Sequence, residues 1–254
     1  MHYDCGWQRR TGSDRAPDAF NLRDPLRIRG IVVQLVLVDL RDGDELLMEA
    51  RQQLADPEHG LQVVQCRAVV LLVRSLGIYS YGFNNFAGFP NTLDVGLVIL
   101  DAPVQTVYPD IDTYASLAAA GTLDAYGTGP DATVTVSGYG LTYTNPNKTI
   151  SYRSRLMAET FIINLTSHNT AGFNVQLATN PGGDRGGTCF GDSGGPVLLD
   201  DTNVITAVNS YVLGQRLTTC KATAFAYRTD QQAVIDWILA HAGTEASEIS
   251  IVTL

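Results

Sequence analysis

The nine residues Cys189-Phe190-Gly191-Asp192-Ser193-Gly194-Gly195-Pro196-Val197 form the most informative stretch of the chain. A nucleophilic serine needs an exposed hydroxyl and backbone N–H groups that point at the oxyanion formed during acyl transfer. Glycines on both sides of Ser193 let the backbone take unusual conformations and let a substrate approach closely. An ordinary glycine-rich turn would explain the glycines and the proline, but not the whole run with its cysteine. We therefore predict Ser193 as a nucleophile, with the N–H groups of Gly191 and Ser193 as oxyanion donors.

The same run resembles the nucleophile loop of the trypsin/chymotrypsin family of serine endopeptidases. Other stretches resemble further segments of that family, in the family's order. Leu93–Leu100 resembles the segment that carries the catalytic aspartate, and Ser137–Gly140 resembles a Gly-aromatic-Gly turn. Asn209–Tyr211 and Cys220 resemble the surroundings of the specificity pocket, and Asp236-Trp237-Ile238 resembles the end of the closing helix. The resemblance covers residues 77–240, about two thirds of the chain. It implies two six-stranded antiparallel β-barrels with the active site between them.

The resemblance assigns the catalytic aspartate to Asp94, which comes directly before an apolar strand. In this family the aspartate orients a histidine and stabilises the imidazolium that forms during the reaction. A strand-start aspartate that caps a turn is the alternative for Asp94. We also predict that Asp192 is a buried anion that holds the nucleophile loop and pairs with a buried cation.

The family's specificity pocket maps onto five positions of this chain: Gly187, Thr188, Ser210, Val212 and Phe225. Gly187 stands at the base of the pocket, so nothing acidic is present there to bind arginine or lysine. Val212 and Phe225 stand where the family often has glycine, and bulky walls shorten a pocket. We therefore expect a preference for small or medium apolar residues. The resemblance also implies a Cys189–Cys220 disulfide beside the pocket, while the pairing of Cys5 and Cys66 stays open.

The family's catalytic histidine has no clear counterpart. It is expected upstream of the aspartate, in a run similar to Thr-Ala-Ala-His-Cys, but the matching stretch Leu46–Ala50 contains no histidine. His168 and His241 follow Asp94 and are therefore out of order, and His2 is too close to the start. His59 is the remaining upstream candidate, although an exposed turn explains its surroundings better. Without a base for the serine hydroxyl, the mechanism fails.

Composition changes abruptly near residue 76. Residues 1–76 hold 10 arginines, no lysine and one threonine, whereas residues 77–254 hold 7 basic residues and 23 threonines. We therefore divide the chain into an atypical N-terminal segment, residues 1–76, and a trypsin-like domain, residues 77–254. The first segment is either unrelated to the family or translated from a wrong reading frame, start or exon boundary. The missing histidine falls in the same segment, and the first barrel is expected to be incomplete or aberrant.

The second part of the chain predicts an all-β fold. Short β-rich runs separated by turn residues lie at 95–100, 133–136, 158–165, 197–199, 204–208 and 222–227. One helix is expected near the C-terminus, where Thr229–Gln232 has the spacing of a capping box. Its apolar face is predicted at Val234, Ile235, Ile238 and Leu239.

The remaining properties bound the function. The net charge of −9 and the pI of about 4.8 argue against nucleic acid and anionic membranes as partners. No cofactor is expected, because the cysteine spacings fit no zinc pattern. We expect a secreted monomer that acts on proteins or peptides. Two Asn-x-Thr sequons, at Asn147 and Asn164, are compatible with secretion, although Met1–Arg10 lacks the apolar core of a signal peptide and Ile31–Val38 is either a weak one or a buried strand.

Three functions fit these observations. The first is a secreted serine endopeptidase, which the retained Ser193, Asp94 and oxyanion segment favour. The second is a pseudoprotease, a protease fold that binds proteins without cleaving them, which the missing histidine favours. The third is a protein of two parts whose N-terminal segment has a role of its own, and nothing in residues 1–76 names such a role.

Overall fold

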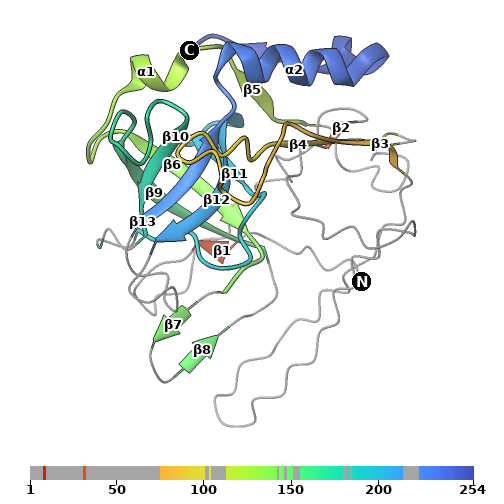
Figure 1. Cartoon of the computed structure of the whole chain (residues 1–254). Helices are drawn as coiled ribbons and strands as arrows, with labels where there is room; N and C mark the ends of the chain where they lie inside the picture. Colours follow the sequence, from red (N-terminus) through yellow and green to blue (C-terminus); the bar gives the residue numbers. More distant parts are fainter. Residues whose placement is uncertain are drawn as a thin grey trace, which may run out of the picture.

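The computed structural model describes the chain at residues 8–9, 31–32, 75–100, 103, 113–141, 143–145, 148–150, 155–179, 182, 185–213 and 223–254. Within these ranges the fold is mostly β, with one closed barrel, a smaller sheet beside it and one long helix (Figure 1). The predicted all-β class with a C-terminal helix is confirmed. Of the first barrel, the described residues form only a three-stranded sheet.

The closed barrel has six strands. In their order around the barrel they are β6 (Thr133–Gly138), β9 (Leu156–Asn164), β10 (Asn174–Ala178), β13 (Thr223–Arg228), β12 (Val204–Leu213) and β11 (Pro196–Leu199). Each strand is antiparallel to its neighbours. The barrel closes because β11 pairs with both β12 and β6, so no edge of these six strands is left open. Five of the six strands match predicted β-rich runs, with their ends moved by a few residues, whereas β10 was not predicted.

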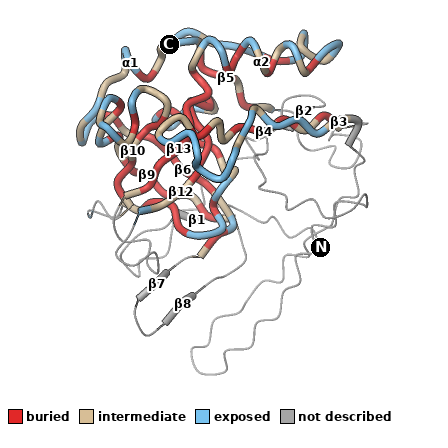
Figure 2. Tube along the Cα trace, in the orientation of Figure 1, coloured by how far each residue is buried: buried red, intermediate tan, exposed pale blue. Residues whose placement is uncertain are grey.

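The barrel interior is filled by alternate side chains of these strands. Val134, Val136, Ile162 and Val197 are at most 2% exposed and belong to one core cluster. Such alternation is expected where one face of each strand points into the barrel. Figure 2 shows that buried residues concentrate along these strands.

A second sheet consists of β2 (Ile31–Val32), β4 (Gly96–Leu100) and β3 (Ser75–Ser80), all antiparallel. Ile31 and Val32 are therefore in a strand, which was one of the two alternatives predicted for residues 31–38. Residues 33–38 lie outside the described part. The remaining strands are short: β1 (Gln8–Arg9), parallel to β9; β5 (Ser116–Ala118), parallel to both β12 and β14 (Ile251–Val252); and the hairpin of β7 (Tyr143–Asn145) and β8 (Lys148–Ile150).

Helix α2 (Gln232–Ala242) packs Val234, Ile238 and Ala242 onto a second core cluster, and Ile235 is also buried. The predicted capping box is wrong. The Thr229 N–H donates to the Thr206 carbonyl of β12, and the helix begins only after Gln231, which has no side-chain cap. A short helix α1 (Thr122–Tyr126) and a 3₁₀ helix η3 (Gly243–Glu248) complete the fold. Among the described residues, no helix is long and apolar enough to cross a membrane.

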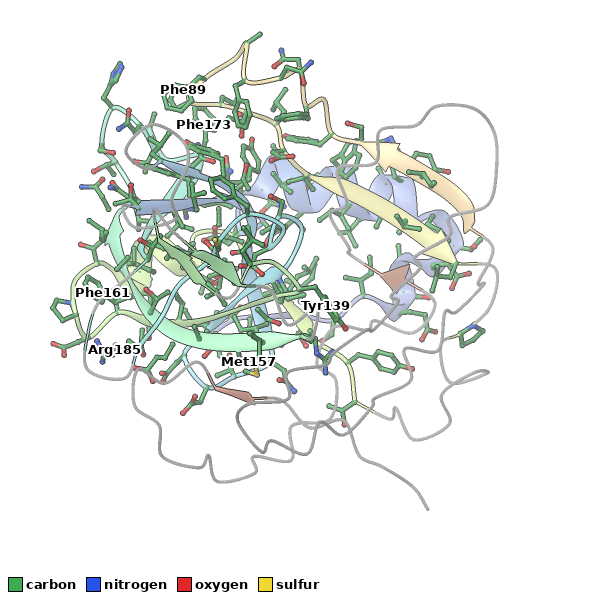
Figure 3. All side chains as sticks on the ribbon, turned by 90° about the horizontal axis from the view of Figure 1, so that it is seen from below. Phe89, Tyr139, Met157, Phe161, Phe173 and Arg185 are labelled. Atoms are coloured by element: carbon green, nitrogen blue, oxygen red, sulfur yellow. The ribbon has the colours of Figure 1, made fainter. Side chains whose placement is uncertain are left out.

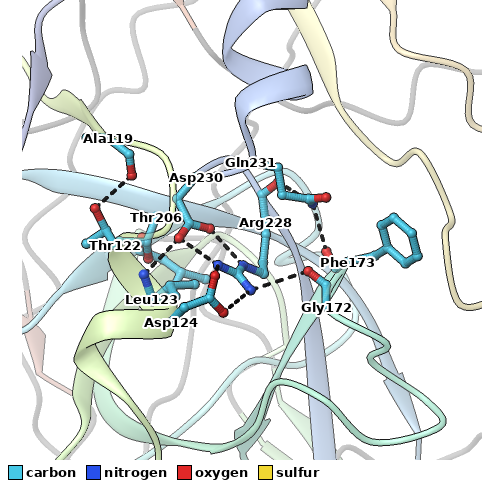
Figure 4. Close-up of polar contacts among 11 residues, drawn as sticks. Ala119, Thr122, Leu123, Asp124, Gly172, Phe173, Thr206, Arg228, Asp230 and Gln231 are labelled. Atoms are coloured by element: carbon cyan, nitrogen blue, oxygen red, sulfur yellow. Dashed lines mark hydrogen bonds and ion pairs between the residues drawn. The ribbon is translucent and has the colours of Figure 1, made fainter.

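A buried arginine joins α1 to the barrel. The guanidinium of Arg228, at the end of β13, is 3% exposed and binds the carboxylates of Asp230 and Asp124 (Figure 4). Asp230 is also buried, and its Oδ2 accepts a hydrogen bond of 2.8 Å from the Leu123 N–H of α1. Burial lowers the pKa of Arg228, but its hydrogen bonds to Asp230 and Asp124 outweigh this effect and raise that pKa above the ordinary value. The guanidinium is therefore charged, and the two carboxylates accept its hydrogen bonds.

We expect Asp230→Ala to lower the free energy of unfolding by about 3–5 kcal/mol, because it leaves a buried guanidinium with the exposed Asp124 as its remaining carboxylate partner. It also leaves the Leu123 N–H without its acceptor. Urea denaturation measures the change. Asp236→Ala is the matched control, because that exposed carboxylate accepts only from Gln232 on the same helix, and it should cost at most about 0.5 kcal/mol. Equal stability of the two variants would contradict the prediction.

Candidate active site

The loop that carries Ser193 is fixed by the carboxylate of Asp192. This side chain is 3% exposed; its Oδ1 accepts a hydrogen bond of 2.8 Å from the Gly140 N–H, and its Oδ2 accepts one of 2.7 Å from the Cys189 N–H. A carboxylate that accepts backbone hydrogen bonds is stabilised in its charged form. The buried anion is thus where the sequence predicted it, but these partners are N–H groups, and the expected buried cation stays a prediction.

The Gly-aromatic-Gly turn of residues 138–140 owes its composition to this contact. A Cβ atom on Gly140 would lie 2.6 Å from the Phe190 carbonyl oxygen and 2.7 Å from the Asp192 nitrogen, which are closer than real Cβ contacts. A Cβ atom on Gly138 would collide with the Asp192 carboxylate. The turn therefore needs glycine at both positions so that Asp192 can reach the backbone beneath it.

Ser193 and Asp94 are joined through Ser210. The Ser193 Oγ donates a hydrogen bond of 2.9 Å to the Ser210 carbonyl oxygen. The Ser210 hydroxyl in turn donates to Oδ2 of Asp94, a residue 116 positions away in the sequence. The structure thus brings together three of the residues predicted for the site. The sequence placed Ser210 on the pocket wall and did not foresee its hydrogen bond to Asp94.

The segment that carries Asp94 is tied to the barrel by two hydrogen bonds just upstream of it. The Asn174 side-chain amide donates to the Pro90 carbonyl oxygen at 2.6 Å, and the Tyr227 hydroxyl donates to Oδ1 of Asn91 at 2.7 Å. Asn174 is the first residue of β10, and Tyr227 is fully buried in β13. These two bonds fix where residues 90–94 meet the barrel, and no sequence pattern indicated them.

The Asp94 carboxylate is only partly exposed, and burial raises its pKa above the ordinary value. The hydrogen bond from Ser210 acts in the opposite direction, because it stabilises the charged form. The raised pKa is therefore the balance of desolvation against one hydroxyl donor.

Backbone donors beside Ser193 are available for an oxyanion. Gly194 N–H donates to the Asn209 carbonyl oxygen and Gly195 N–H to that of Asp192. In contrast, the N–H groups of Gly191 and Ser193 donate to no acceptor within the described ranges, and both residues are exposed. The loop thus uses the later N–H groups for its own structure and leaves the two predicted donors open.

The described histidines do not supply a base for Ser193. His168 is exposed in the turn after β9, and His241 lies on α2, with its Nδ1 2.8 Å from the Trp237 carbonyl oxygen. Neither forms a hydrogen bond to Ser193 or Asp94 in the part of the chain that the structure describes. His59, the predicted base, lies outside that part.

Comparison with known proteins agrees with this geometry. The trypsin family model, described as "Trypsin", matches residues 80–238. The chain belongs to the trypsin family. No curated protein sequence matches the chain.

Several solved structures are similar to this trypsin-family chain. A structure titled HL collagenase is 22% identical, with 67% of this chain and 69% of that chain covered and a TM-score of 0.45. Mouse neuropsin, titled as a serine protease expressed in the limbic system of the brain, is 16% identical, with 66% and 71% covered and a TM-score of 0.47. The scabies mite inactivated protease paralogue S-I1 is 14% identical, with 67% and 68% covered and a TM-score of 0.43.

The residues expected in the specificity pocket differ in their surroundings. Gly187 and Thr188 are buried, and a Cβ atom on Gly187 would collide with the Thr179 Cα, so no side chain fits there. Phe225 is 1% exposed and stacks on Tyr211, with ring centroids 4.7 Å apart and planes 7° apart. Its neighbours Ala224 and Ala226 belong to the barrel core. Because side chains alternate along a strand, Phe225 faces the opposite way.

An aromatic surface extends from this stack, beside Ser210. Tyr211 contacts Phe86 edge-on at 5.2 Å and Phe89 at 6.2 Å between ring centroids. Phe86 and Phe89 are each 40% exposed, so the rings are open to solvent on one side. Figure 3 shows Phe89 on the same side of the molecule as Phe173, which directly precedes the residue that binds Pro90. The sequence did not indicate this surface, because its rings come from two segments more than 100 residues apart.

Cys189 is buried and is not a free thiol. Its predicted partner Cys220 lies outside the described ranges, as do Cys5 and Cys66. The Cys189–Cys220 pairing therefore stays a prediction.

We expect Ser210→Ala to raise the pKa of Asp94 further, because it removes the hydroxyl that stabilises the carboxylate while burial remains. Carboxyl-carbon NMR over a pH titration measures this directly and needs no enzymatic activity. Ser193→Ala is the matched control: it removes a hydroxyl of the same size that bonds to a backbone carbonyl instead of Asp94, so the pKa of Asp94 should barely move. An unchanged pKa in Ser210→Ala would show that this hydrogen bond is absent in solution.

Proposed function

We propose that this chain is a serine endopeptidase that hydrolyses peptide bonds through an acyl-enzyme. The observation that supports this most is the Ser193–Ser210–Asp94 connection, together with the two open N–H groups of Gly191 and Ser193. A binding protein with no catalytic history has no need of a hydroxyl, a carboxylate and oxyanion donors in one place. Membership of the trypsin family supports the same reaction class.

In the proposed reaction, the Ser193 Oγ attacks the scissile carbonyl carbon while a base accepts its proton. The carbonyl oxygen becomes an oxyanion, which the N–H groups of Gly191 and Ser193 stabilise. The protonated base then gives its proton to the leaving amine, and the acyl group stays on Ser193. Water, deprotonated by the same base, hydrolyses the ester and restores the serine. Asp94 orients the base and stabilises its cationic form.

The base is the part of the proposal with the least support. A histidine is required by the family's mechanism, and His59 is the candidate upstream of Asp94. The second candidate function is a pseudoprotease, a catalytically inactive protein-binding module. It is favoured by one specific observation, namely that neither described histidine bonds to Ser193 or Asp94. An experiment on the intact chain separates the two.

A fluorophosphonate probe should label Ser193 if the site is active, because this probe reacts only with a serine whose hydroxyl is activated. Labelling should be lost in Ser193→Ala. In Asp94→Asn we expect it to slow by about 10⁴-fold, because the wrong tautomer of the base is then favoured. Peptide mapping by mass spectrometry locates the label. A folded chain that takes up no label would instead identify a pseudoprotease.

His59→Ala adds a third arm to this experiment. If His59 is the base, its removal should slow labelling about as strongly as the loss of a triad histidine, on the order of 10⁶-fold. Labelling of unchanged rate would exclude His59 and point to a base elsewhere in residues 1–74. A circular dichroism spectrum of His59→Ala that matches the spectrum of the parent chain controls for misfolding.

We also propose a preference for small or medium apolar side chains before the scissile bond. Gly187 supports it, because the base of the pocket carries no charge and its backbone packing excludes any side chain. Val212 is left out of the proposed wall, because it packs against the barrel core and pairs with the core residue Ala224. Phe225 is left out of the proposed wall, because its ring is engaged with Tyr211.

Cleavage of a peptide library by the unlabelled parent chain tests this preference. We expect cuts after residues such as alanine, valine and leucine. Cuts confined to arginine and lysine would refute the proposed pocket.

The proposed setting of this activity is extracellular. Secretion is supported by the family and by a cysteine that is not a free thiol, which suits an oxidising compartment. We propose the Cys189–Cys220 disulfide as a brace for the pocket, proteins or peptides as substrates, and a monomer as the working form.

A further inference from the structure

One of the two Asn-x-Thr sequons falls in a well-defined turn of the barrel. Asn164 is the last residue of β9, Leu165 is 5% exposed and anchored in the barrel core, and Thr166 is exposed. The asparagine is half-buried, at the mouth of the turn that leads to β10. The other sequon cannot be compared, because Asn147 lies outside the described residues.

The Asn164 side chain is held in a fixed direction. Its Oδ1 accepts hydrogen bonds from the backbone N–H of Thr166 at 2.8 Å and of Ser167 at 2.6 Å. Its Nδ2 donates to no acceptor among the described residues, and it is not one of their buried atoms without a partner. An amide nitrogen that is neither bonded nor buried faces solvent. In this turn the amide oxygen of Asn164 is therefore hydrogen-bonded, and the amide nitrogen points to solvent.

We propose that Asn164 is an N-glycosylation site, occupied when the chain passes through a eukaryotic secretory pathway. The donor is a lipid-linked oligosaccharide pyrophosphate. The Asn164 Nδ2 forms a bond to the anomeric carbon of the donor, the bond from that carbon to the pyrophosphate oxygen breaks, and the lipid pyrophosphate leaves with the electron pair. One Nδ2 proton is lost to a base of the transferring enzyme. No oxidation or reduction takes place.

The folded turn can keep the attached glycan without rearrangement. The bond is made by Nδ2, so both hydrogen bonds to Oδ1 survive glycosylation. The side chain of Asn164 has no contact with Ser193, Ser210 or Asp94, so the glycan leaves the catalytic connection intact.

This inference rests on the proposed secretion but not on proteolytic activity. The test is expression of the full chain in a eukaryotic cell behind a cleavable signal peptide, which supplies entry to the pathway. Inactive Ser193→Ala serves as the background, so that self-cleavage cannot interfere. A peptide N-glycosidase shift and glycopeptide mapping then measure the occupancy of Asn164 and Asn147 separately.

Two substitutions of Thr166 make the test specific. Thr166→Ala destroys the sequon but keeps Asn164 and the backbone N–H groups that it binds, so the fold should be unaffected; we expect occupancy of Asn164 to fall from most of the molecules to none. Thr166→Ser keeps a sequon and should keep the glycan. Transfer precedes folding, so retained chains are scored together with secreted ones. An unmodified Asn164 in the parent chain, or one still modified in Thr166→Ala, would overturn the proposal.

Discussion

The buried carboxylate of Asp192 is the contact on which the arrangement of the site depends. It reaches two backbone N–H groups, one in the turn after β6 and one at Cys189, and so holds the nucleophile loop against the barrel. Charged acceptors bind N–H donors more strongly than neutral ones, and the side chain of Asp192 is only 3% exposed. The glycines of residues 138–140 and the positions of Gly191 and Ser193 all follow from this one interaction.

The sequence was informative where local chemistry decides the structure. The run around Ser193 and five strands of the barrel were predictable, because glycine spacing and β-rich runs between turns have local causes. The α2 helix was predictable too, through the period of Val234, Ile235 and Ile238. Its start was not: Thr229 continues the barrel pairing, and tertiary contact overrode a local capping pattern.

Contacts between distant segments could not be predicted. Arg228 gave no sign that it would be buried between Asp230 and Asp124, since a lone arginine at a strand end is ordinarily exposed. Phe225 was assigned to the pocket by counting from Tyr227, but the face on which a strand residue lies changes with a shift of one position. The Asp94–Ser210 bond joins segments that only the folded chain brings together.

The two hydrogen bonds from Asn174 and Tyr227 have a consequence for the maturation of such a chain. The hydroxyl of Ser193 belongs to the barrel, whereas Asp94 arrives on a separate segment that must dock through Pro90 and Asn91. A barrel that has formed alone therefore holds a nucleophile without its carboxylate. Changes at Asn174 or Tyr227, both within the barrel, would therefore act on the site through the position of Asp94.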